Sequence, residues 1–278
     1  MSTVEAGAAE KMVFRKTNAR AGRTISVTPA NSTMRHLSYG RIILDAGTPS
    51  VKFSNGGQET GFVCLSGSAD VIVSGGDSVP KFHLDQYDAI YISRDSEIEV
   101  TSAGGVDIAE FSTDVEKEYP VQFVARAAAV KDPALHFVTG GPGNTRDLNI
   151  AIGKNVNAGR LLVGFTFSEP GNWTSWPPHE HEHMLEELYV YFDMPAPAFG
   201  IQLVYKNTEY PELVTVVRDG DAVLMPAGYH PNVSVPGHRI AFLWAMAAHR
   251  EVEDRQFGVV NVQPGFGQGG TGLEQSRK

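Results

Sequence analysis

Three histidines on alternate positions, closely followed by two glutamates, are the side chains in this sequence best suited to chemistry. His179, His181 and His183 lie in the run WPPHEHEHMLEELYVYF, and Glu186 and Glu187 follow within it. Side chains two residues apart on an extended strand project to the same side, so His179 and His181 can share one cation. Imidazole nitrogens and carboxylate oxygens are common ligands of zinc and related divalent metals. The pattern predicts a metal site.

The remaining ligands must come from the next turn or from another strand. Glu186 and Glu187 both have suitable spacing for a carboxylate ligand, and the spacing alone does not choose between them. His230 follows a Pro-x-Gly turn in the run MPAGYHP, which can deliver it to a strand across a small barrel. His183 shares the parity of the first two histidines, but we expect it in the adjoining loop or beside the ligands, not as a fifth ligand.

Short β-strands must position these side chains, because nearly every segment of the chain alternates with period two. The segments are rich in Val, Ile, Phe and Tyr, and Gly, Pro, Asn or Asp separates them. Only residues 121–131, with their alanines, are compatible with a short helix. Many short strands at regular spacing are typical of β-sandwiches and small β-barrels. The sequence therefore predicts an all-β protein.

A run rich in glycine and proline divides the chain into two predicted domains. Residues 139–149, TGGPGNTRDLN, are expected to be a linker, because this composition interrupts regular structure. Residues 12–138 are expected to form an N-terminal barrel without metal ligands, and residues 150–265 a C-terminal barrel that binds the metal. Residues 1–11 and 266–278 are expected to be flexible tails. The 278 residues are sufficient for two domains of ordinary size.

The two predicted domains also resemble copies of one another. The segment 88–90, Asp-Ala-Ile, matches the segment 221–223, Asp-Ala-Val. In this alignment Glu97 lies opposite His230, and residues 51–53, Val-Lys-Phe, stand where histidines would be expected. We therefore predict a duplicated barrel in which the second copy alone kept the metal-binding residues.

Composition excludes several classes of partner. The net charge is −9 and no block of Lys or Arg is present, so nucleic acids and anionic membranes are not expected partners, whereas a small molecule is. Cys64 is the single cysteine, which excludes a disulfide framework and a thiolate cluster. The first eleven residues do not resemble a secretory signal, and the longest apolar run, 240–248, is too short to cross a membrane. We expect a cytoplasmic protein.

Both histidine motifs resemble the signature motifs of the cupin superfamily. The first reads His-x-His followed by Glu, and the second reads Gly220, Pro226, Gly228 and His230. The second motif has one residue between its last glycine and the histidine where the general pattern has two, and no glycine closes the first. The segments GNWTSWPPHEH, LEELYVYF, AFGIQLVY and GYHP resemble, more narrowly, the 5-deoxy-glucuronate isomerase family. This resemblance runs over residues 12–263.

The resemblance implies two tandem cupin-type β-barrels, a jelly-roll-like bicupin with the metal site in the C-terminal barrel. It implies one divalent metal per chain, with zinc expected and manganese, iron, cobalt or nickel compatible with the same donors. The implied ligands are His179, His181, Glu187 and His230. Alignment of the strand ELYVYFD selects Glu187, which leaves Glu186 on the opposite face. Relatives in this family assemble and exposed edge strands commonly pair, so a homo-oligomer is expected.

The activity implied by the resemblance is the isomerisation of a deoxy-uronic acid, from 5-deoxy-glucuronate to 5-dehydro-2-deoxy-gluconate in myo-inositol catabolism. Such an aldose–ketose isomerase moves a proton between adjacent carbons and needs a general base. We expect a catalytic set of Glu186, Tyr191 and Gln202, with His183 or a metal-bound hydroxide as other candidate bases. Tyr191 alternates with Glu187, and Gln202 is an amide in an apolar strand that needs a polar partner.

Three alternatives remain open at the level of sequence. The related 5-keto-4-deoxyuronate isomerase family shares the Tyr-Phe-Asp ending at residues 191–193. Cupin dioxygenases use the same ligand types, and a sugar-binding cupin would need no activity. Arg146 is consistent with an ion pair to an acid or with a bidentate contact to a substrate carboxylate, and the sequence does not assign it.

Overall fold

The computed structural model describes residues 11–75, 79–266 and 272–273, and within them the chain is almost entirely β-structure. The only helix in this part of the chain is the single turn α2 (Arg126–Ala129). The all-β prediction is therefore confirmed. Most of the two predicted tails, 1–11 and 266–278, lies outside the described residues. No helix in the described part is long and apolar enough to span a membrane.

The N-terminal unit packs a six-stranded sheet against a four-stranded sheet. The large sheet has the order β11-β8-β5-β10-β3-β2 and the small sheet the order β4-β9-β6-β7. The strands are β2 (Gly22–Val27), β3 (Ser38–Leu44), β4 (Ser50–Ser54), β5 (Gln58–Gly67), β6 (Ala69–Ser74), β7 (Lys81–Leu84), β8 (Ala89–Ile92), β9 (Glu97–Thr101), β10 (Val106–Asp114) and β11 (Gln122–Val124). Apolar side chains from both sheets form the core between them.

The C-terminal unit repeats this arrangement. Its large sheet has the order β1-β20-β17-β22-β14-β13-β12, its small sheet the order β15-β21-β18-β19, and β16 pairs with β23. The strands are β1 (Val13–Phe14), β12 (His136–Thr139), β13 (Arg146–Ile152), β14 (Leu161–Ser168), β15 (Trp173–Thr174), β16 (His179–Glu180), β17 (Leu185–Tyr191), β18 (Gly200–Val204), β19 (Leu213–Val217), β20 (Ala222–Met225), β21 (Asn232–Ser234), β22 (Ala241–Ala248) and β23 (Asn261–Val262).

Nine strands of each unit follow the same order, as a duplication predicts. In the large sheets β8, β5, β10, β3 and β2 match β20, β17, β22, β14 and β13, and in the small sheets β4, β9, β6 and β7 match β15, β21, β18 and β19. The aligned residues Ala89 and Ala222 each begin the equivalent strand, β8 or β20. The internal repeat read from the sequence is thus also a repeat of topology.

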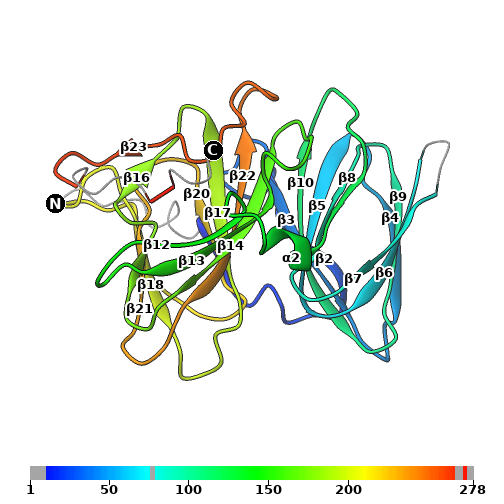
Figure 1. Ribbon diagram of the computed structural model, residues 1–278, viewed down its shortest axis with the longest axis horizontal. Coiled ribbons are helices and arrows are strands. Elements are labelled where there is room, and N and C mark those ends of the chain that lie inside the picture. Colours follow the sequence, from blue (N-terminus) through cyan, green and yellow to red (C-terminus); the bar gives the residue numbers. More distant parts are fainter. Residues whose placement is uncertain (1–10, 76–78, 267–271, 274–278) are drawn as a thin grey trace.

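The two large sheets face each other across a shared apolar core (Figure 1). Strand β17 runs through the middle of its sheet between β20 and β22, and all seven of its residues are buried. Leu188 and Val190 belong to the core between the units, whereas Tyr189 and Tyr191 belong to the core inside the C-terminal unit. The alternation of side chains along this one strand therefore connects two different interiors.

The predicted linker at residues 139–149 is wrong as a domain boundary. Strands β12 and β13 pair there as an antiparallel hairpin, with Thr139 opposite Arg146, at the edge of the C-terminal sheet. The N-terminal unit's last strand is β11, and α2 lies between it and β12. Strand β1 also leaves its predicted domain, since Val13 pairs with Val223 of β20. Glycine and proline mark a change of chain direction, which a hairpin turn and a linker both require.

Two buried glutamates at equivalent positions join the units to each other. The carboxylate of Glu186 in β17 accepts hydrogen bonds from the backbone N–H groups of residues 35–37, at 2.7–2.8 Å. The carboxylate of Glu59 in β5 accepts hydrogen bonds from the backbone N–H groups of residues 159–161, at 2.7 Å each. Both amide runs lie at the beginning of an equivalent strand, β3 or β14. Each unit thus supplies a carboxylate that binds backbone amides at the start of a strand in the other unit.

Replacing either carboxylate by an amide should weaken the fold without touching the metal site. We expect Glu186→Gln and Glu59→Gln each to lower the free energy of unfolding by about 2–3 kcal/mol, because charge-assisted hydrogen bonds to buried amides are lost. Urea denaturation followed by circular dichroism measures this, and exposed Glu97→Gln serves as the control with an effect within about 0.5 kcal/mol. Unchanged denaturation midpoints for both buried positions would contradict the assignment.

Candidate metal centre

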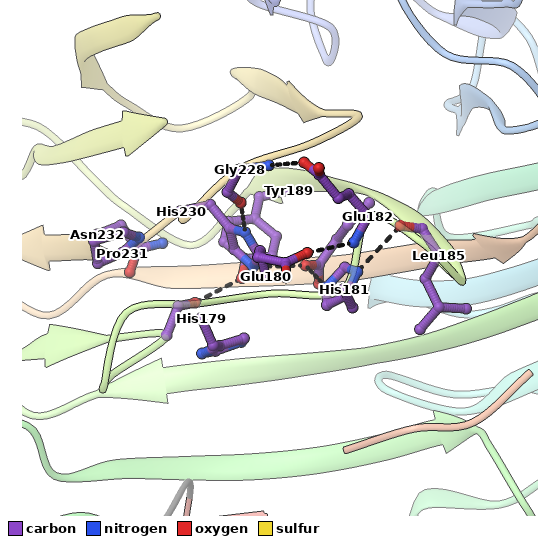
Figure 2. A network of polar contacts seen from close by, with 12 residues as sticks. His179, Glu180, His181, Glu182, Leu185, Tyr189, Gly228, His230, Pro231 and Asn232 are labelled. Atoms are coloured by element: carbon purple, nitrogen blue, oxygen red, sulfur yellow. Dashed lines mark hydrogen bonds and ion pairs between the residues drawn. The ribbon is translucent and has the colours of Figure 1, made fainter. Parts of the chain in front are cut away.

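His181, Glu187 and His230 converge inside the C-terminal unit, where all three side chains are buried. Figure 2 shows His181 and His230 within the polar contacts around this group. The Nε2 atoms of His181 and His230 each lie 3.0 Å from Oε2 of Glu187. One ligand atom from each residue lies within 4.8 Å of the other two. Two imidazole nitrogens and a carboxylate oxygen in this proximity form a ligand set for a divalent cation.

Strand and turn geometry bring the three residues together from separate parts of the chain. Glu187 lies in β17, opposite Met225 of β20, and His181 precedes that strand in the turn that follows β16. His230 follows Gly228, whose φ of 92° is left-handed and whose close approach to the Tyr205 carbonyl leaves little room for a side chain. The predicted Pro-x-Gly turn therefore delivers His230 into the interior.

The tautomers of the histidines favour metal binding. In each ring Nδ1 lies against a backbone carbonyl oxygen, which can only accept a hydrogen bond, so Nδ1 carries the proton and Nε2 presents a lone pair in the neutral ring. The three pairs are His179 with Pro177 at 2.8 Å, His181 with Leu185 at 3.1 Å and His230 with Gly228 at 2.9 Å. Nε2 of all three rings is thus available as a metal ligand.

Nε2 of His230 supplies a direct test of whether a cation fits. This buried atom has no hydrogen-bond partner among the described residues, although it lies 3.0 Å from the Glu187 carboxylate. The contact lacks hydrogen-bond geometry, and a lone pair beside a carboxylate oxygen is unfavourable without a positive charge between them. The residues present therefore fit a divalent metal held by His181, Glu187 and His230.

His179, the fourth predicted ligand, lies beside this group. Its ring centroid is 5.0 Å from that of His230 and 6.4 Å from that of His181 (Figure 2). His179, His181 and Glu187 line one pocket. His179 does not belong to the set whose ligand atoms all lie within 4.8 Å of one another. The structure therefore brings together three of the four predicted ligands and places the fourth next to them.

Burial and mutual contacts set the protonation states of these groups. Burial by itself raises the pKa of Glu187, but its contacts with His181 and His230 outweigh burial and lower that pKa to about 2. Burial likewise disfavours protonated His181, yet its hydrogen bond to Glu187 raises its pKa above the ordinary value. Burial and the neighbouring His230 ring lower the pKa of His179 to about 3. At neutral pH the site therefore holds an ionised carboxylate beside a neutral His179.

Glu186, predicted as a catalytic residue, does not reach the site. It projects from the opposite face of β17, where its carboxylate binds the amides of residues 35–37 in the other unit. The alternation of a strand sends Glu186 and its neighbour Glu187 to opposite sides. The expectation of a general base at Glu186 is therefore corrected to a structural contact between the units.

Tyr191 and Gln202, the other predicted catalytic residues, form a buried polar network behind the ligands. The Tyr191 hydroxyl donates to Oε1 of Gln202 at 2.5 Å, and Nδ2 of Asn232 donates to both, at 3.0 and 3.2 Å. Nε2 of Gln202 donates to the backbone oxygen of His230 at 2.9 Å. Neither Tyr191 nor Gln202 lines the pocket. Gln202 thus contacts the backbone at His230 and Tyr191 contacts Gln202, while a catalytic role for either residue stays a prediction.

At the positions equivalent to Glu187 and His230, the described part of the N-terminal unit carries a threonine and an isoleucine. Strand pairing equates Thr60 of β5 with Glu187, because Thr60 pairs with Ile92 as Glu187 pairs with Met225. The pairing of strands in the small sheets makes Ile98 the equivalent of His230, whereas the sequence alignment predicted Glu97. The two differ because the segment from the end of β8 to Ile98 is one residue longer than the segment from the end of β20 to His230. The expectation that only the second copy kept the polar set agrees with these pairings.

The pocket beside the ligands carries a hydroxyl pair that sequence analysis did not select. Tyr189 lines the pocket, and its hydroxyl lies 2.6 Å from Oγ of Ser175, which lines it as well. Burial and the Glu187 carboxylate both raise the pKa of Tyr189, so this hydroxyl is neutral. Alternation with Glu187 placed both Tyr189 and Tyr191 on the metal side in the sequence. Tyr189 lines the pocket and Tyr191 does not, because Tyr191 lies two residues farther along β17. The sequence does not show how far along the strand the pocket extends.

Arg146 also lines the pocket, and the sequence left it unassigned. It lies in β13 and is buried, and its guanidinium donates to the backbone oxygens of Asn144 and Trp176, at 3.0 and 2.8 Å. It lines the pocket together with His181, Glu187 and Tyr189. Arg146 lies two residues before Leu148, on the same face of β13. An arginine on an apolar strand face was the sequence feature that could have indicated a buried guanidinium. The pocket thus joins a cation site to a fixed guanidinium.

An all-β chain of two equivalent units with a buried histidine and glutamate set in one of them is a cupin-like protein with a candidate metal centre. The model of the KduI/IolB family matches residues 12–260, and the chain belongs to this family. Among curated relatives, the 5-deoxy-glucuronate isomerase of Bacillus velezensis is 27% identical over 238 residues, covering 80% of this chain and 84% of the relative. That of Bacillus subtilis strain 168 is 32% identical over 169 residues, 58% of this chain and 60% of the relative.

Solved structures agree on the fold. An IolB-like protein from Salmonella typhimurium LT2 superposes with a TM-score of 0.80 at 22% identity, covering 92% of this chain and 98% of that one. Oxalate decarboxylase from Bacillus subtilis gives a TM-score of 0.60 at 11% identity, covering 84% of this chain and 75% of that one. At these identities the likeness shows a shared cupin-like fold.

Removal of one ligand should abolish metal binding while the fold persists. We expect His230→Ala to lower the affinity for a divalent metal at least about 100-fold, because it removes a direct ligand. Elemental analysis of the purified protein measures metal content, and circular dichroism checks the fold. His183→Ala is the matched control, because His183 is an exposed neighbour outside the ligand set and should retain the metal. Full metal content in His230→Ala would refute the site.

Proposed function

We propose that this chain is a metal-dependent aldose–ketose isomerase that converts 5-deoxy-glucuronate into 5-dehydro-2-deoxy-gluconate in myo-inositol catabolism. The observation that supports it most directly is the set of His181, Glu187 and His230 beside a pocket that His181 and Glu187 line together with Arg146. Membership of the KduI/IolB family and the names of the curated relatives point to the same reaction.

The donor set supports zinc as the metal, with His179 as a fourth ligand, and manganese, iron, cobalt and nickel accept the same donors. When bound, a divalent metal acts as a Lewis acid that polarises a carbonyl and stabilises negative charge on oxygen. The chain prepares this site through the ionised Glu187 and through Nδ1 contacts that aim each histidine. The Tyr191 and Gln202 network fixes the backbone at His230.

Protein groups around the pocket handle protons and exclude water. The neutral Tyr189 hydroxyl and Oγ of Ser175 are 2.6 Å apart, so they can pass a proton between substrate oxygens as carbonyl and hydroxyl exchange places. Phe242, Trp244 and Met246 line the adjoining wall and keep the pocket apolar. An apolar wall strengthens every electrostatic contact made inside the pocket.

Arg146 gives the pocket a means to recognise the carboxylate of a uronic acid. Its contacts with the Asn144 and Trp176 oxygens hold the guanidinium in the pocket wall. Guanidinium groups bind carboxylates by paired, charge-assisted hydrogen bonds. A substrate with its carbonyl at the metal and its carboxylate at Arg146 would be bound at both ends.

Substrate conversion by the purified metal-loaded protein tests the proposal. We expect proton NMR to show 5-deoxy-glucuronate turning into its ketone isomer, with no consumption of oxygen. His230→Ala should lose at least about 100-fold in kcat/KM, because metal binding is lost. Conversion of the pectin-derived 5-keto-4-deoxyuronate in its place would reassign the substrate, oxygen uptake would support a dioxygenase, and no reaction with metal present would favour a sugar-binding cupin.

Loss of the guanidinium should impair binding of the acid more than turnover. We expect Arg146→Gln to raise KM for the uronate about 10- to 100-fold with a smaller change in kcat, because a carboxylate contact is similar in the ground and transition states. Steady-state kinetics with the uronate and with its neutral methyl ester measures the effect. The ester should show little difference between wild type and variant, and equal losses for acid and ester would argue against carboxylate recognition.

A further inference from the structure

The outer face of the small C-terminal sheet is apolar across all four of its strands. Val216 of β19 pairs with Ile201 of β18, Ile201 with Val233 of β21, and Val233 with Trp173 of β15, so these four side chains form one row. None of them belongs to the three apolar cores of the described chain. The row therefore faces outward, away from the interior of its unit.

The duplicated unit provides an internal reference for this face. Corresponding pairings in the small N-terminal sheet give the row His83, Asp70, Thr101 and Ser50, all polar. Asp70 there binds His83 at 2.8 Å and Lys81 at 2.9 Å. The same sheet face in the same chain is thus polar in one unit and apolar in the other. Exposed apolar patches of this kind mark interaction surfaces.

The apolar face extends beyond the row at both ends. On the β19 side Val214 is 58% exposed and Val216 is 37% exposed, and Tyr210 in the preceding turn is 72% exposed. On the β15 side the Trp173 ring lies 5.3 Å from that of Trp176, which contacts the partly exposed ring of Phe266. We call the surface formed by the row together with Val214 and Leu203 the β18 face.

The charges at the two ends of β19 identify the partner that suits this face. Arg218 follows the strand, while Glu209 and Glu212 precede it, and none of the three forms an ion pair in the described chain. A second copy related by a twofold axis would place Arg218 of each molecule near the glutamates of the other, while the apolar rows meet. We propose that the β18 face is the interface of a homodimer.

Face-to-face packing fits better than pairing of strand edges. The open edge of β19 is occupied by Arg15, whose guanidinium donates to the backbone oxygen of Val216 and to Oγ1 of Thr215, both at 2.6 Å. A further strand could not bind those groups without displacing Arg15. Two sheets stacked through their apolar faces require no such displacement. The proposed dimer is independent of the proposed activity.

Sedimentation of the full chain, with residues exchanged between equivalent positions, tests the interface. Val214 and Val216 correspond to Lys81 and His83 of the N-terminal sheet. We expect wild type to sediment as a dimer at micromolar concentration and the double variant Val214→Lys with Val216→His to dissociate at least about tenfold more readily. The control Lys81→Val with His83→Val should not weaken the dimer. A monomeric wild type, or a double variant as dimeric as wild type, overturns the proposal.

Charge reversal keeps the test decisive if the double variant folds poorly. Arg218→Glu should weaken the dimer several-fold, and Arg218→Glu combined with Glu212→Arg should restore it, because the opposite charges would then meet again across the twofold axis. Thermal denaturation confirms that each variant is folded. A dimer that is insensitive to Arg218→Glu, or one that the second substitution does not restore, contradicts the twofold arrangement.

Discussion

Two adjacent carboxylates on β17 point to opposite sides of one buried strand, and both the metal centre and the union of the two units depend on that arrangement. Glu187 enters the C-terminal interior and contacts His181 and His230. Glu186 enters the core between the units and binds the amides of residues 35–37. Burial of either charge is tolerated only because each finds several polar partners. A shift of register by one residue would move one carboxylate into the position of the other and leave the second among the apolar side chains that surround Leu185 or Leu188.

The two equivalent units differ in the residues around the metal centre but share the contacts that join them. The polar layer of Tyr191, Gln202 and Asn232 behind the ligands is replaced in the N-terminal unit by Cys64, Val71 and Val100, as strand pairing shows. That unit retains Glu59, the counterpart of Glu186, and with it the reciprocal hydrogen bonds to residues 159–161. The N-terminal unit thus has the glutamate that joins the units, but not the polar residues that surround the metal centre in the C-terminal unit.

Much of the fold and of the ligand set follows from sequence, because both depend on short-range periodicity. Alternation along strands indicated the all-β class and the common face of His179 and His181, whereas the resemblance to a known family selected Glu187 over Glu186. Long-range pairing was not predictable in the same way: the turn at 139–149 joins β12 to β13 within one sheet, and no local signal distinguishes that hairpin from a linker. Pocket depth is also a tertiary property, so the sequence distinguishes neither Tyr189 from Tyr191 nor a pocket role for Arg146 from a structural one.

The placement of β1 has a consequence for any attempt to separate the units. Val13 and Phe14 complete the edge of the C-terminal sheet against β20, although the chain then continues into the N-terminal unit. A gene fragment encoding only residues after α2 would leave that edge uncovered. Glu186 would lose the donor amides of residues 35–37, and the amides of residues 159–161 would lose the carboxylate of Glu59. A transfer of the C-terminal unit into another protein would therefore have to include β1 from the opening segment of the chain.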